Sequence, residues 1–419
     1  MVEKLFKLKE RGTNVKTEIA AGLTTFMTMA YILAVNPNVL SQTGMDATAV
    51  LLATCLASFI GTVCMAFMAN LPFALSAGMG LNAYMAYTVC GNLGYSWQVA
   101  LLAVFIEGIV FIILSLTKVR EAIFDAIPLS LKRAVSVGIG LFIAFIGLQN
   151  AGLAVDSATL VKLVDFRENF NTSGICALLA LSGLLIMAVL YIKRVKGAIL
   201  IGIFATWILG IICELTGLYV PDAESGAFTL IPSFHMTDFS SLSKTFGQCF
   251  NVDMNAVGIF NFIVVIFSFL FVDLFDTLGT LIGVSTKAGL LDKEGKLPAI
   301  RPALMADAIA TTAGAVIGTS TTTTFVESSA GAAAGGRTGL TALTTAVLFL
   351  LSMFLAPIFI AIPAYLCVIA MPLFYSISEG IAIGVISYVV INAACKKFKE
   401  INPIMYILAA LFILKYIFL

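Results

Sequence analysis

The sequence predicts an all-α protein that crosses a membrane many times, and three observations support this prediction. Of 419 residues, 60% are hydrophobic and 11% are charged, and the mean hydropathy is +1.05, far outside the composition of a soluble domain. Windows such as 48–70 and 174–192 carry no charged residue and reach the ~20 residues that a helix needs to span a bilayer. Strand-length segments of alternating polarity, which would predict a barrel, do not appear.

Charge and motif content exclude several other classes of protein. The formal net charge is +1, so the chain lacks the basic surface of a protein that binds nucleic acid. The eight cysteines show neither CxxC nor metal-ligand spacing. No Walker A, GxGxxG, HExxH or GxSxG motif is present. The sequence therefore predicts a protein that is not an enzyme and that uses no cofactor or metal.

Apolar segments alternate with charged or Pro/Gly-containing joints along the whole chain. They predict spans, in order, at residues 19–36, 48–70, 71–90, 96–117, 131–149, 174–192, 197–218, 256–286, 303–318, 325–339, 340–357, 363–376, 378–394 and 401–419. Basic joints lie at 4–16, 118–133, 193–196 and 287–301, and acidic joints at 150–173 and 219–254. Because short basic loops stay in the cytoplasm, we expect a multi-pass cell-membrane protein with a cytoplasmic N-terminus.

The acidic joint at 219–254 divides the chain into two hydrophobic halves, as in transporters built from internal repeats. In such proteins, corresponding positions of the two halves hold interrupted helices beside the substrate site. The segments at 71–87 and 318–336 are the candidates, because each is rich in glycine and each is the third span of its half.

The first candidate, LPFALSAGMGLNAYMAY at 71–87, has the features of a broken helix. Pro72 removes a backbone donor, and Gly80 permits unusual dihedral angles. Asn82 offers donors and acceptors to a polar ligand, and Phe73 offers an aromatic face for stacking. The alternative is that the small residues of this segment only allow close helix packing.

The second candidate, GTSTTTTFVESSAGAAAGG at 318–336, carries a sharper functional signal. Its threonines are polar and β-prone, and irregular backbone is tolerated at membrane depth only where protein or water covers it. Glu327 is an intramembrane carboxylate, which is costly unless it is paired, protonated or in contact with a ligand. The alternative is a carboxylate that only ties two helices together.

Two further carboxylates, Asp273 and Asp276, lie three residues apart in FLFVDLFDTLGTLIGV at 269–284. They share roughly one helix face, and ionising both would be unfavourable. We expect Asp276 to face a ligand, because Gly279 and Thr280 leave room beside it, and Asp273 to pack between helices.

Carboxylates at interrupted helices favour a secondary transporter, in which cation and substrate binding shift one alternating-access equilibrium. Protons are favoured because these groups are titratable, and sodium remains open. Two more acidic residues lie in apolar runs. Glu107 is equally consistent with a structural and a functional role, and Asp307 is expected near a helix N-terminus.

Together these segments resemble the AzgA-like branch of the nucleobase:cation symporters, the adenine, guanine and hypoxanthine permeases. The resemblance covers nearly the whole chain and is strongest in AGLTTFMTMAYILAVNP, PFALSAGMGLNAYMAY, DLFDTLGTLIGV and ADAIATTAGAVIGTSTTTTFVESSAGAAAGGRTGL. It implies a nucleobase transporter fold of seven plus seven inverted repeats, with helices 3 and 10 interrupted and with core and gate domains. Residues 1–218 would form the first repeat (helices 1–7), 219–254 an outer loop, and 255–419 the second repeat (helices 8–14).

The same resemblance implies which residues bind the substrate. Asp276, Glu327 and Asn82 match the binding residues of the family, and the two carboxylates would also couple transport to protons. The remaining residues expected to line the pocket are Phe73, Gly80, Thr280, Phe325 and Val326. The implied function is import of guanine and hypoxanthine, or of adenine, by proton symport through a homodimer in the lipid bilayer.

The chain departs from the family pattern after LFLLSMFLAPIFIAIPAY, where another span is expected before CVIAMPLFYSISEGI. Charges point to the same place: if Arg337 is inside, the predicted spans put Lys396, Lys397 and Lys399 outside, against the rule. Either the second repeat is one gate helix short or two predicted spans are one. The alternatives to a purine symporter are a carrier of the same fold for uracil or xanthine, and a purine-binding membrane protein that does not transport.

Overall fold

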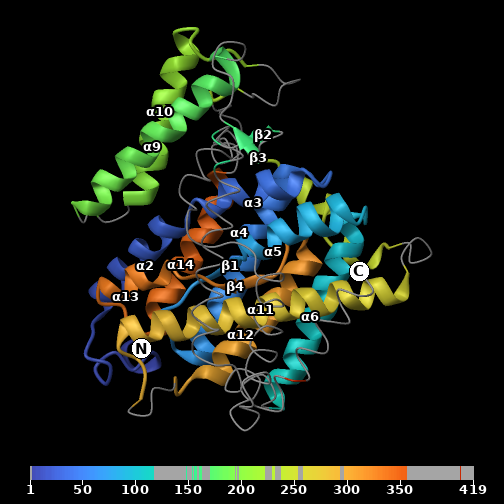
Figure 1. The fold of residues 1–419 in the computed structure, drawn as a ribbon. Coiled ribbons are helices and arrows are strands. Elements are labelled where there is room, and N and C mark those ends of the chain that lie inside the picture. The colour runs from blue at the N-terminus through green and yellow to red at the C-terminus, as the bar shows by residue number, and fades with distance from the viewer. Residues whose placement is uncertain are drawn as a thin grey trace, which may run out of the picture.

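The computed structural model describes residues 2–117, 170–193, 198–221, 237–252, 258–292 and 297–355, with short stretches between 148 and 231 and residue 406. This part of the chain is almost entirely helical (Figure 1). Within it, six helical segments are long and apolar enough to cross a membrane: Val15–Ser41, Ala47–Ala69, Trp97–Leu116, Phe170–Leu190, Ile259–Thr286 and Ile300–Ile317. Two shorter apolar helices are Phe204–Leu215 and Gly339–Leu355.

Several of the described helices begin at a side-chain cap. The first half contains α1 (Val2–Leu5), α2 (Val15–Met29), α3 (Ile32–Ser41), α4 (Ala47–Cys64), the π-helical η1 (Met65–Ala69), β1 (Leu75–Ala77), α5 (Met79–Ala83), the π-helical η2 (Tyr84–Asn92), α6 (Trp97–Leu116), β2 (Val155–Ser157), β3 (Leu160–Lys162), the π-helical η3 (Phe170–Gly174), α9 (Ile175–Ile192) and α10 (Ala198–Leu215). The second half contains the 3₁₀ turns η4 (Phe239–Lys244) and η5 (Gln248–Phe250), α11 (Ile259–Ala288), α12 (Ile300–Ile317), β4 (Thr322–Thr324), α13 (Ser328–Ala333), α14 (Gly339–Ser352) and η7 (Met353–Leu355). Asn14, Asp46 and Ser96 cap α2, α4 and α6 by accepting from the backbone N–H three residues on.

The helices agree with most of the predicted spans that lie in the described residues. At 71–90 and 325–339, where interrupted helices were expected, the structure has only short elements: β1, α5 and η2 in the first segment and α13 in the second. The spans predicted at 48–70, 96–117 and 174–192 coincide with α4 and η1, α6, and α9. The first crossing is longer than predicted, because α2 and α3 together run from Val15 to Ser41. The predicted spans at 131–149 and after residue 363, where the gate helix was expected to be missing, lie outside the described residues.

The hairpin of α9 and α10 stands apart from the body formed by α2–α6 and α11–α14 (Figure 1). Its outward side chains are large and apolar: Leu185 is 67% exposed and Ile192 is 78% exposed. Such a surface is stable in lipid, where hydrocarbon tails replace water.

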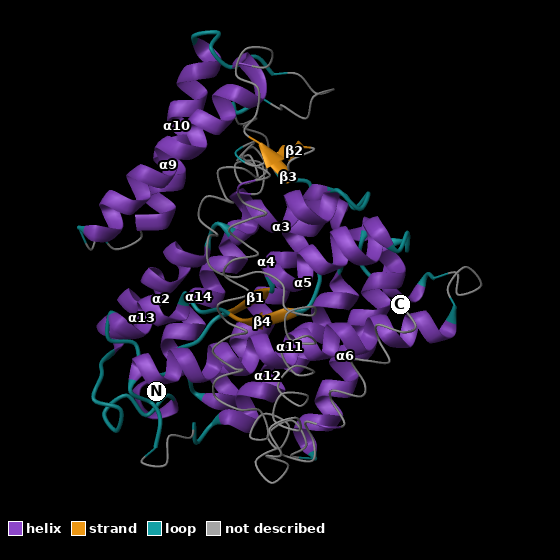
Figure 2. Cartoon of the chain, viewed as in Figure 1, coloured by secondary structure: helices purple, strands orange, loops and turns teal. Residues whose placement is uncertain are grey.

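Two short strands lie at the centre of the helical body, where β1 pairs antiparallel with β4 (Figure 2). Ser76 is opposite Thr323, and backbone bonds from Gly78 to Thr321 and from Phe325 to Ala74 extend the pairing at both ends. In the bilayer interior, unpaired backbone groups cost several kcal/mol. Pairing the two interrupted segments with each other therefore makes both interruptions tolerable at membrane depth.

The two strands are held by matching hydroxyl groups from two helices. Thr62 of α4 donates to the Leu75 carbonyl at 3.2 Å and accepts from the Leu75 N–H at 2.9 Å. Thr311 of α12 does the same for Thr322, at 3.1 and 3.3 Å. Around the central pair of the ladder, these contacts are related as a local two-fold axis would relate them.

The end of the second interrupted segment is anchored to the start of α2 by a buried carboxylate. Glu18 is fully buried and accepts from the backbone N–H groups of Arg337, Thr338 and Thr341 and from the hydroxyls of both threonines, at 2.7–3.2 Å. An anion at the N-terminus of α14 is also favoured by the helix dipole.

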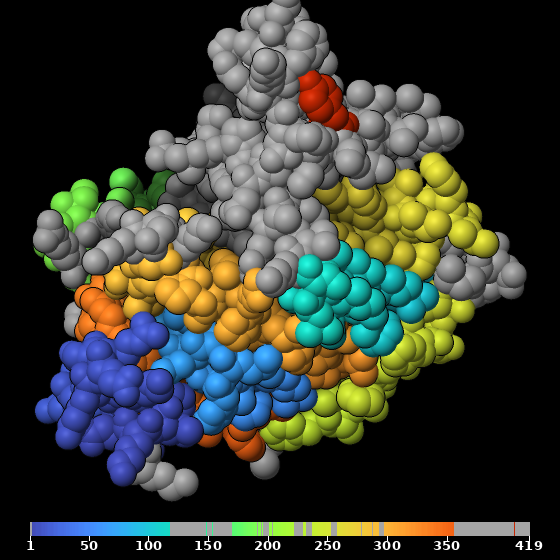
Figure 3. Space-filling view, turned by 90° about the horizontal axis from the view of Figure 1, so that it is seen from below, coloured from blue at the N-terminus to red at the C-terminus, as the bar shows by residue number. Residues whose placement is uncertain are grey.

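The N-terminal residues close the same end of the body (Figure 3). Phe6 and Leu8 are buried against Ala66 and Leu340. Asn70 connects the N-terminal segment to the start of α14, because it donates to the Phe6 carbonyl at 3.1 Å and accepts from the Gly339 N–H at 2.8 Å.

Candidate binding site

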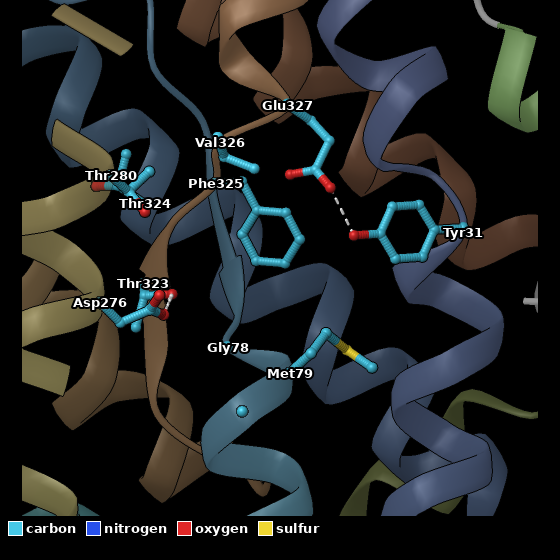
Figure 4. Close-up of a pocket in the computed structure, with 11 residues that line it drawn as sticks. Tyr31, Gly78, Met79, Asp276, Thr280, Thr323, Thr324, Phe325, Val326 and Glu327 are labelled. Atoms are coloured by element: carbon cyan, nitrogen blue, oxygen red, sulfur yellow. Dashed lines mark hydrogen bonds between the residues drawn. The ribbon is translucent and has the colours of Figure 1, made fainter. Parts of the chain in front are cut away.

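A cavity lies where the two interrupted segments meet the first crossing and the middle of α11 (Figure 4). The space between these elements is about 370 Å³ when its opening toward solvent is counted. Its lining consists of Tyr31, Gly78, Met79, Gly80, Asp276, Thr280, Thr323, Thr324, Phe325, Val326 and Glu327. The cavity thus combines two carboxylates, hydroxyl groups and two aromatic rings in a mostly buried setting.

One wall of the cavity is formed by Glu327 and Tyr31. Glu327 is the residue just before α13, and Tyr31 lies between α2 and α3, where the first crossing tightens. The Tyr31 hydroxyl donates to Glu327 Oε1 at 2.6 Å, a length typical of a hydrogen bond to a carboxylate. Thr28, in the last turn of α2, reaches the Glu327 carbonyl at 3.5 Å. The first crossing therefore holds the side chain of Glu327 through Tyr31 and contacts its backbone at the long limit of a hydrogen bond.

The opposite wall is formed by Asp276 of α11 and Thr323 of β4 (Figure 4). The Thr323 hydroxyl lies 3.4 Å from Asp276 Oδ2, at the long limit of a hydrogen bond. Thr280 follows one helical turn after Asp276 on the same face. The side chain of Phe325 lies between the two walls. A planar ligand in this cavity would meet a carboxylate on either side and an aromatic face.

The start of α5 contributes a glycine-rich edge. Gly78, Met79 and Gly80 line the cavity at the point where β1 ends. A Cβ added to Gly78 would lie 3.0 Å from Thr323 Oγ1 and 3.2 Å from its Cγ2. Any side chain here would press on Thr323, so glycine suits the close approach of the two interrupted segments.

Six of the eight residues predicted for the site line this cavity, and two do not. The six are Asp276, Glu327, Gly80, Thr280, Phe325 and Val326. Phe73 is fully buried in a separate hydrophobic cluster, and Asn82 is buried one turn into α5. Sequence reasoning missed Tyr31, Gly78, Met79, Thr323 and Thr324 as lining residues. Tyr31 could have been suspected, because its hydroxyl interrupts the apolar run MTMAYILAV.

Asn82 is the centre of a buried polar network behind the cavity. Its amide donates to Asn36 Oδ1 at 2.5 Å, and its carbonyl oxygen accepts from the Ser320 hydroxyl. Asn36 in turn donates to Thr54 at 2.7 Å and to Thr319 at 2.9 Å. The network ties α3, α4 and α5 to the stretch just before β4, so it fixes the relative position of the two interrupted segments.

Three further carboxylates are buried outside the cavity. Asp273 accepts from Thr277 at 2.8 Å, and the same hydroxyl lies 3.0 Å from Asp307 of α12. The prediction that Asp273 packs between helices agrees with this contact. Glu107 accepts from the Thr321 hydroxyl at 2.8 Å. Within the described residues, no group of three or more His, Cys, Asp or Glu side chains is arranged to hold a metal ion.

Comparisons with known proteins connect this geometry to a family. The profile Xan_ur_permease, described as Permease family, matches residues 16–388. The chain is 44% identical to the guanine/hypoxanthine permease PbuO of Bacillus subtilis, over 98% of this chain and 99% of that protein. It is 38% identical to the adenine permease AdeP of Escherichia coli, over 100% of this chain and 96% of that protein.

Solved structures share the fold at low sequence identity. The transmembrane domain of the cyanobacterial bicarbonate transporter BicA has a TM-score of 0.61 at 15% identity, covering 96% of this chain and 95% of that chain. The murine anion transporter Slc26a9 in its inward-facing state has a TM-score of 0.54 at 12% identity, covering 85% of this chain and 59% of that chain. The chain thus has the helical, multi-pass fold class of these transporters.

The full-length similarity confirms the resemblance that the motifs indicated, and it identifies a transporter rather than an enzyme. This chain belongs to the Permease family, in the branch that includes guanine/hypoxanthine and adenine permeases.

Proposed function

We propose that the protein imports a purine nucleobase across the cell membrane as a secondary transporter coupled to protons. The observation that carries this proposal is the placement of Asp276 and Glu327 on opposite walls of one cavity, with Phe325 between them. Relatives of full length are named as permeases for guanine/hypoxanthine and for adenine.

The chemistry of the lining suits a purine. Purines carry ring N–H donors together with nitrogen or oxygen acceptors, and an ionised carboxylate is an acceptor that pairs with ring N–H groups. The hydroxyls of Thr280 and Thr323 can donate to ring acceptors, and Phe325 offers a face for stacking. Asn82 and Phe73 would act from behind the cavity, by holding its walls in place.

Coupling to protons follows from the same carboxylates. A protonated carboxyl group donates one hydrogen bond, whereas an ionised group only accepts. Binding of a proton and binding of a base at Asp276 or Glu327 therefore influence each other, as linked equilibria must. Such linkage is what a symporter needs, and a proton requires no further ligands.

The proposal extends to the architecture and orientation. The matching contacts of Thr62 and Thr311 support two inverted repeats, residues 1–218 and 255–419, separated by the outer loop 219–254. The charges of the joints support a cytoplasmic N-terminus. The family resemblance supports core and gate domains and a homodimer.

The second repeat is proposed to be one gate helix short. The alignment with PbuO runs over 451 positions, although this chain has 419 residues. The relative thus carries positions without a counterpart here, which is consistent with the span that the sequence is expected to lack after residue 365. The competing function is a purine-binding membrane protein that does not transport.

Uptake measurements test the proposal. Cells that lack their own purine permeases would be supplied with radiolabelled hypoxanthine, guanine, adenine or uracil, with and without a protonophore. We expect uptake of at least one purine, loss of that uptake with the protonophore, and loss of uptake in Glu327→Gln and Asp276→Asn. Glu10→Gln is the control, because this carboxylate is 71% exposed in the N-terminal segment.

The outcomes separate the competing functions. Uptake of uracil but not of purines would replace the substrate and keep the transporter. Purine binding by the purified protein without uptake would indicate a binding protein whose missing gate helix prevents transport. If the protein neither binds nor takes up any purine, the proposed function is wrong.

A further inference from the structure

We infer that Tyr31 is a positioning residue that fixes the carboxylate of Glu327 for purine recognition and so sets the affinity for the base. This inference rests on the proposed function and adds to it a residue that neither the family resemblance nor the comparisons assign. Tyr31 comes from the break between α2 and α3, far in the sequence from both carboxylates.

Packing of the Tyr31 ring fixes the position of its hydroxyl group beside Glu327. Tyr31 is 7% exposed, and its ring packs in the largest hydrophobic cluster of the described residues. A tyrosine side chain has only two rotatable torsions before its hydroxyl, so packing of the ring fixes the position of the oxygen. That oxygen lies 2.6 Å from Glu327 Oε1. The hydroxyl can donate to an ionised carboxylate or accept from a protonated one, so the contact is available in both states.

The two carboxylates of the cavity differ in how firmly they are held. Glu327 has one more rotatable bond than Asp276, yet its hydrogen bond to Tyr31 measures 2.6 Å, whereas the contact between Thr323 and Asp276 measures 3.4 Å. Holding a flexible side chain in its binding orientation lowers the entropy cost of ligand binding. The hydrogen bond from Tyr31 therefore restrains Glu327, the carboxylate side chain that would otherwise lose more conformational entropy when a ligand binds.

Thr28 completes the arrangement from the backbone side. Its hydroxyl approaches the Glu327 carbonyl at 3.5 Å, one turn before Tyr31. Tyr31 and Thr28 together make the end of α2 a support for the start of α13. Tyr31 thereby couples the position of the first crossing to the position of Glu327, the residue proposed to bind the base.

The test is Tyr31→Phe, which removes the hydroxyl and keeps the ring. Loss of a hydrogen bond to a charged group corresponds to roughly a tenfold change in affinity. We expect the KM for the transported purine to rise about tenfold, with the maximal uptake rate and the melting temperature nearly unchanged. Tyr95→Phe is the matched control, because it also removes one hydroxyl but does not line the cavity; its KM should equal that of the wild type.

A spectroscopic measurement distinguishes positioning from a general structural role. Infrared spectra of the purified protein, recorded without purine, would identify the Glu327 carboxyl band as the one lost in Glu327→Gln. In Tyr31→Phe this band should shift, whereas in Tyr95→Phe it should not.

The outcomes distinguish failure of the proposed role of Tyr31 from failure of the proposed function. An unchanged KM with an unchanged carboxylate band, in a background where the wild type takes up purine, overturns the role of Tyr31 and leaves the proposed function intact. A fall in maximal rate with KM unchanged also overturns it, because the residue would then only support the fold. Absence of purine uptake and binding in the wild type overturns the proposed function and this inference with it.

Discussion

The segment around β1, which we call the supporting segment, contributes mainly backbone and small residues to the cavity. The segment around β4, which we call the reading segment, contributes the side chains that can bind a ligand. In the first segment, Ser76 pairs with Ser58 at 2.7 Å and Asn82 pairs with the network behind the cavity. In the second, Thr323, Phe325 and Glu327 all line the cavity. Two segments that pair strand to strand thus have different functions, because one supports and the other recognises.

This difference shows how an irregular backbone can be used at membrane depth. The polar side chains of the first segment form hydrogen bonds away from the cavity, and Gly78 of this segment approaches Thr323 of the second segment closely. The second segment contributes the longer side chains of Phe325 and Glu327 to the lining of the cavity. We therefore expect substitutions in the supporting segment and in the anchors of the two segments to change stability, and substitutions of cavity-lining side chains in the reading segment to change KM.

The largest effect is expected where the second segment is anchored. Glu18→Ala removes the acceptor of five hydrogen bonds at the start of α14, leaving buried donors unpaired, and we expect a loss of about 4 kcal/mol. Thermal melting of the purified protein measures this loss. Glu10→Ala, at an exposed carboxylate, should leave the melting temperature unchanged, and a stable Glu18→Ala protein would show that the anchor is not needed.

The next largest loss of stability is expected in the supporting segment. Asn82→Leu leaves Asn36 and Ser320 without their buried partner, which corresponds to a loss of about 3 kcal/mol. Melting should fall, while the KM of the remaining uptake stays close to the wild-type value. A KM raised tenfold without loss of stability would instead place Asn82 at the base and break the distinction between the two segments.

In the reading segment, Phe325→Ala removes the aromatic face of the cavity. Stacking of a base on an aromatic side chain contributes about 1–3 kcal/mol, so KM for the purine should rise roughly tenfold or more, with a smaller change in melting. Uptake at several purine concentrations measures it. An unchanged KM would show that the base does not stack on this ring.

A smaller effect is expected from Gly78→Ala, which tests the contact between the two segments directly. The added methyl group would lie 3.0 Å from Thr323 Oγ1, so the strands must shift slightly, at a cost of about 1 kcal/mol. We expect uptake to fall several-fold. Gly283→Ala in α11, where an added Cβ meets nothing within 4 Å, is the control, and equal uptake by both variants would argue against a tight fit at Gly78.

The smallest effect is expected far from both segments, at the ion pair between Asp46 and Lys244, whose charged atoms are 2.6 Å apart. Partial burial raises the pKa of Asp46, but hydrogen bonds from Lys244 and from the Ala49 N–H outweigh it, so the pKa lies below its usual value. A lowered pKa stabilises the fold above the unfolded-state pKa, and this stabilisation is lost as pH falls through the folded-state value.

Asp46→Asn tests this pair, because asparagine keeps the helix cap and removes the charge. The melting temperature should be slightly lower than that of the wild type at pH 7, and the difference should shrink as pH falls below about 4. It should also shrink in high salt, which screens exposed charges. A difference that stays constant across these conditions would mean that the pair does not contribute through its charges.

Much of the fold and part of the site could be predicted from the residues alone. Apolar runs place α4, α6 and α9 in the membrane, because transfer of uncharged helices into lipid depends on composition and length. The interruptions at 71–87 and 318–336 were visible as glycine-rich and threonine-rich breaks. Glu327 and Asp276 were visible because a carboxylate in an apolar run needs a partner or a ligand.

The tertiary structure decided which residues meet. Sequence spacing could not show that Tyr31 reaches Glu327, that Asn82 turns toward Asn36, or that Thr323 reaches Asp276, since these partners are far apart in the chain. Membrane insertion is determined segment by segment by the cost of burying charge and unpaired backbone. The choice of partner for each polar group is determined by packing, because a side chain bonds only to what neighbouring helices bring within about 3 Å.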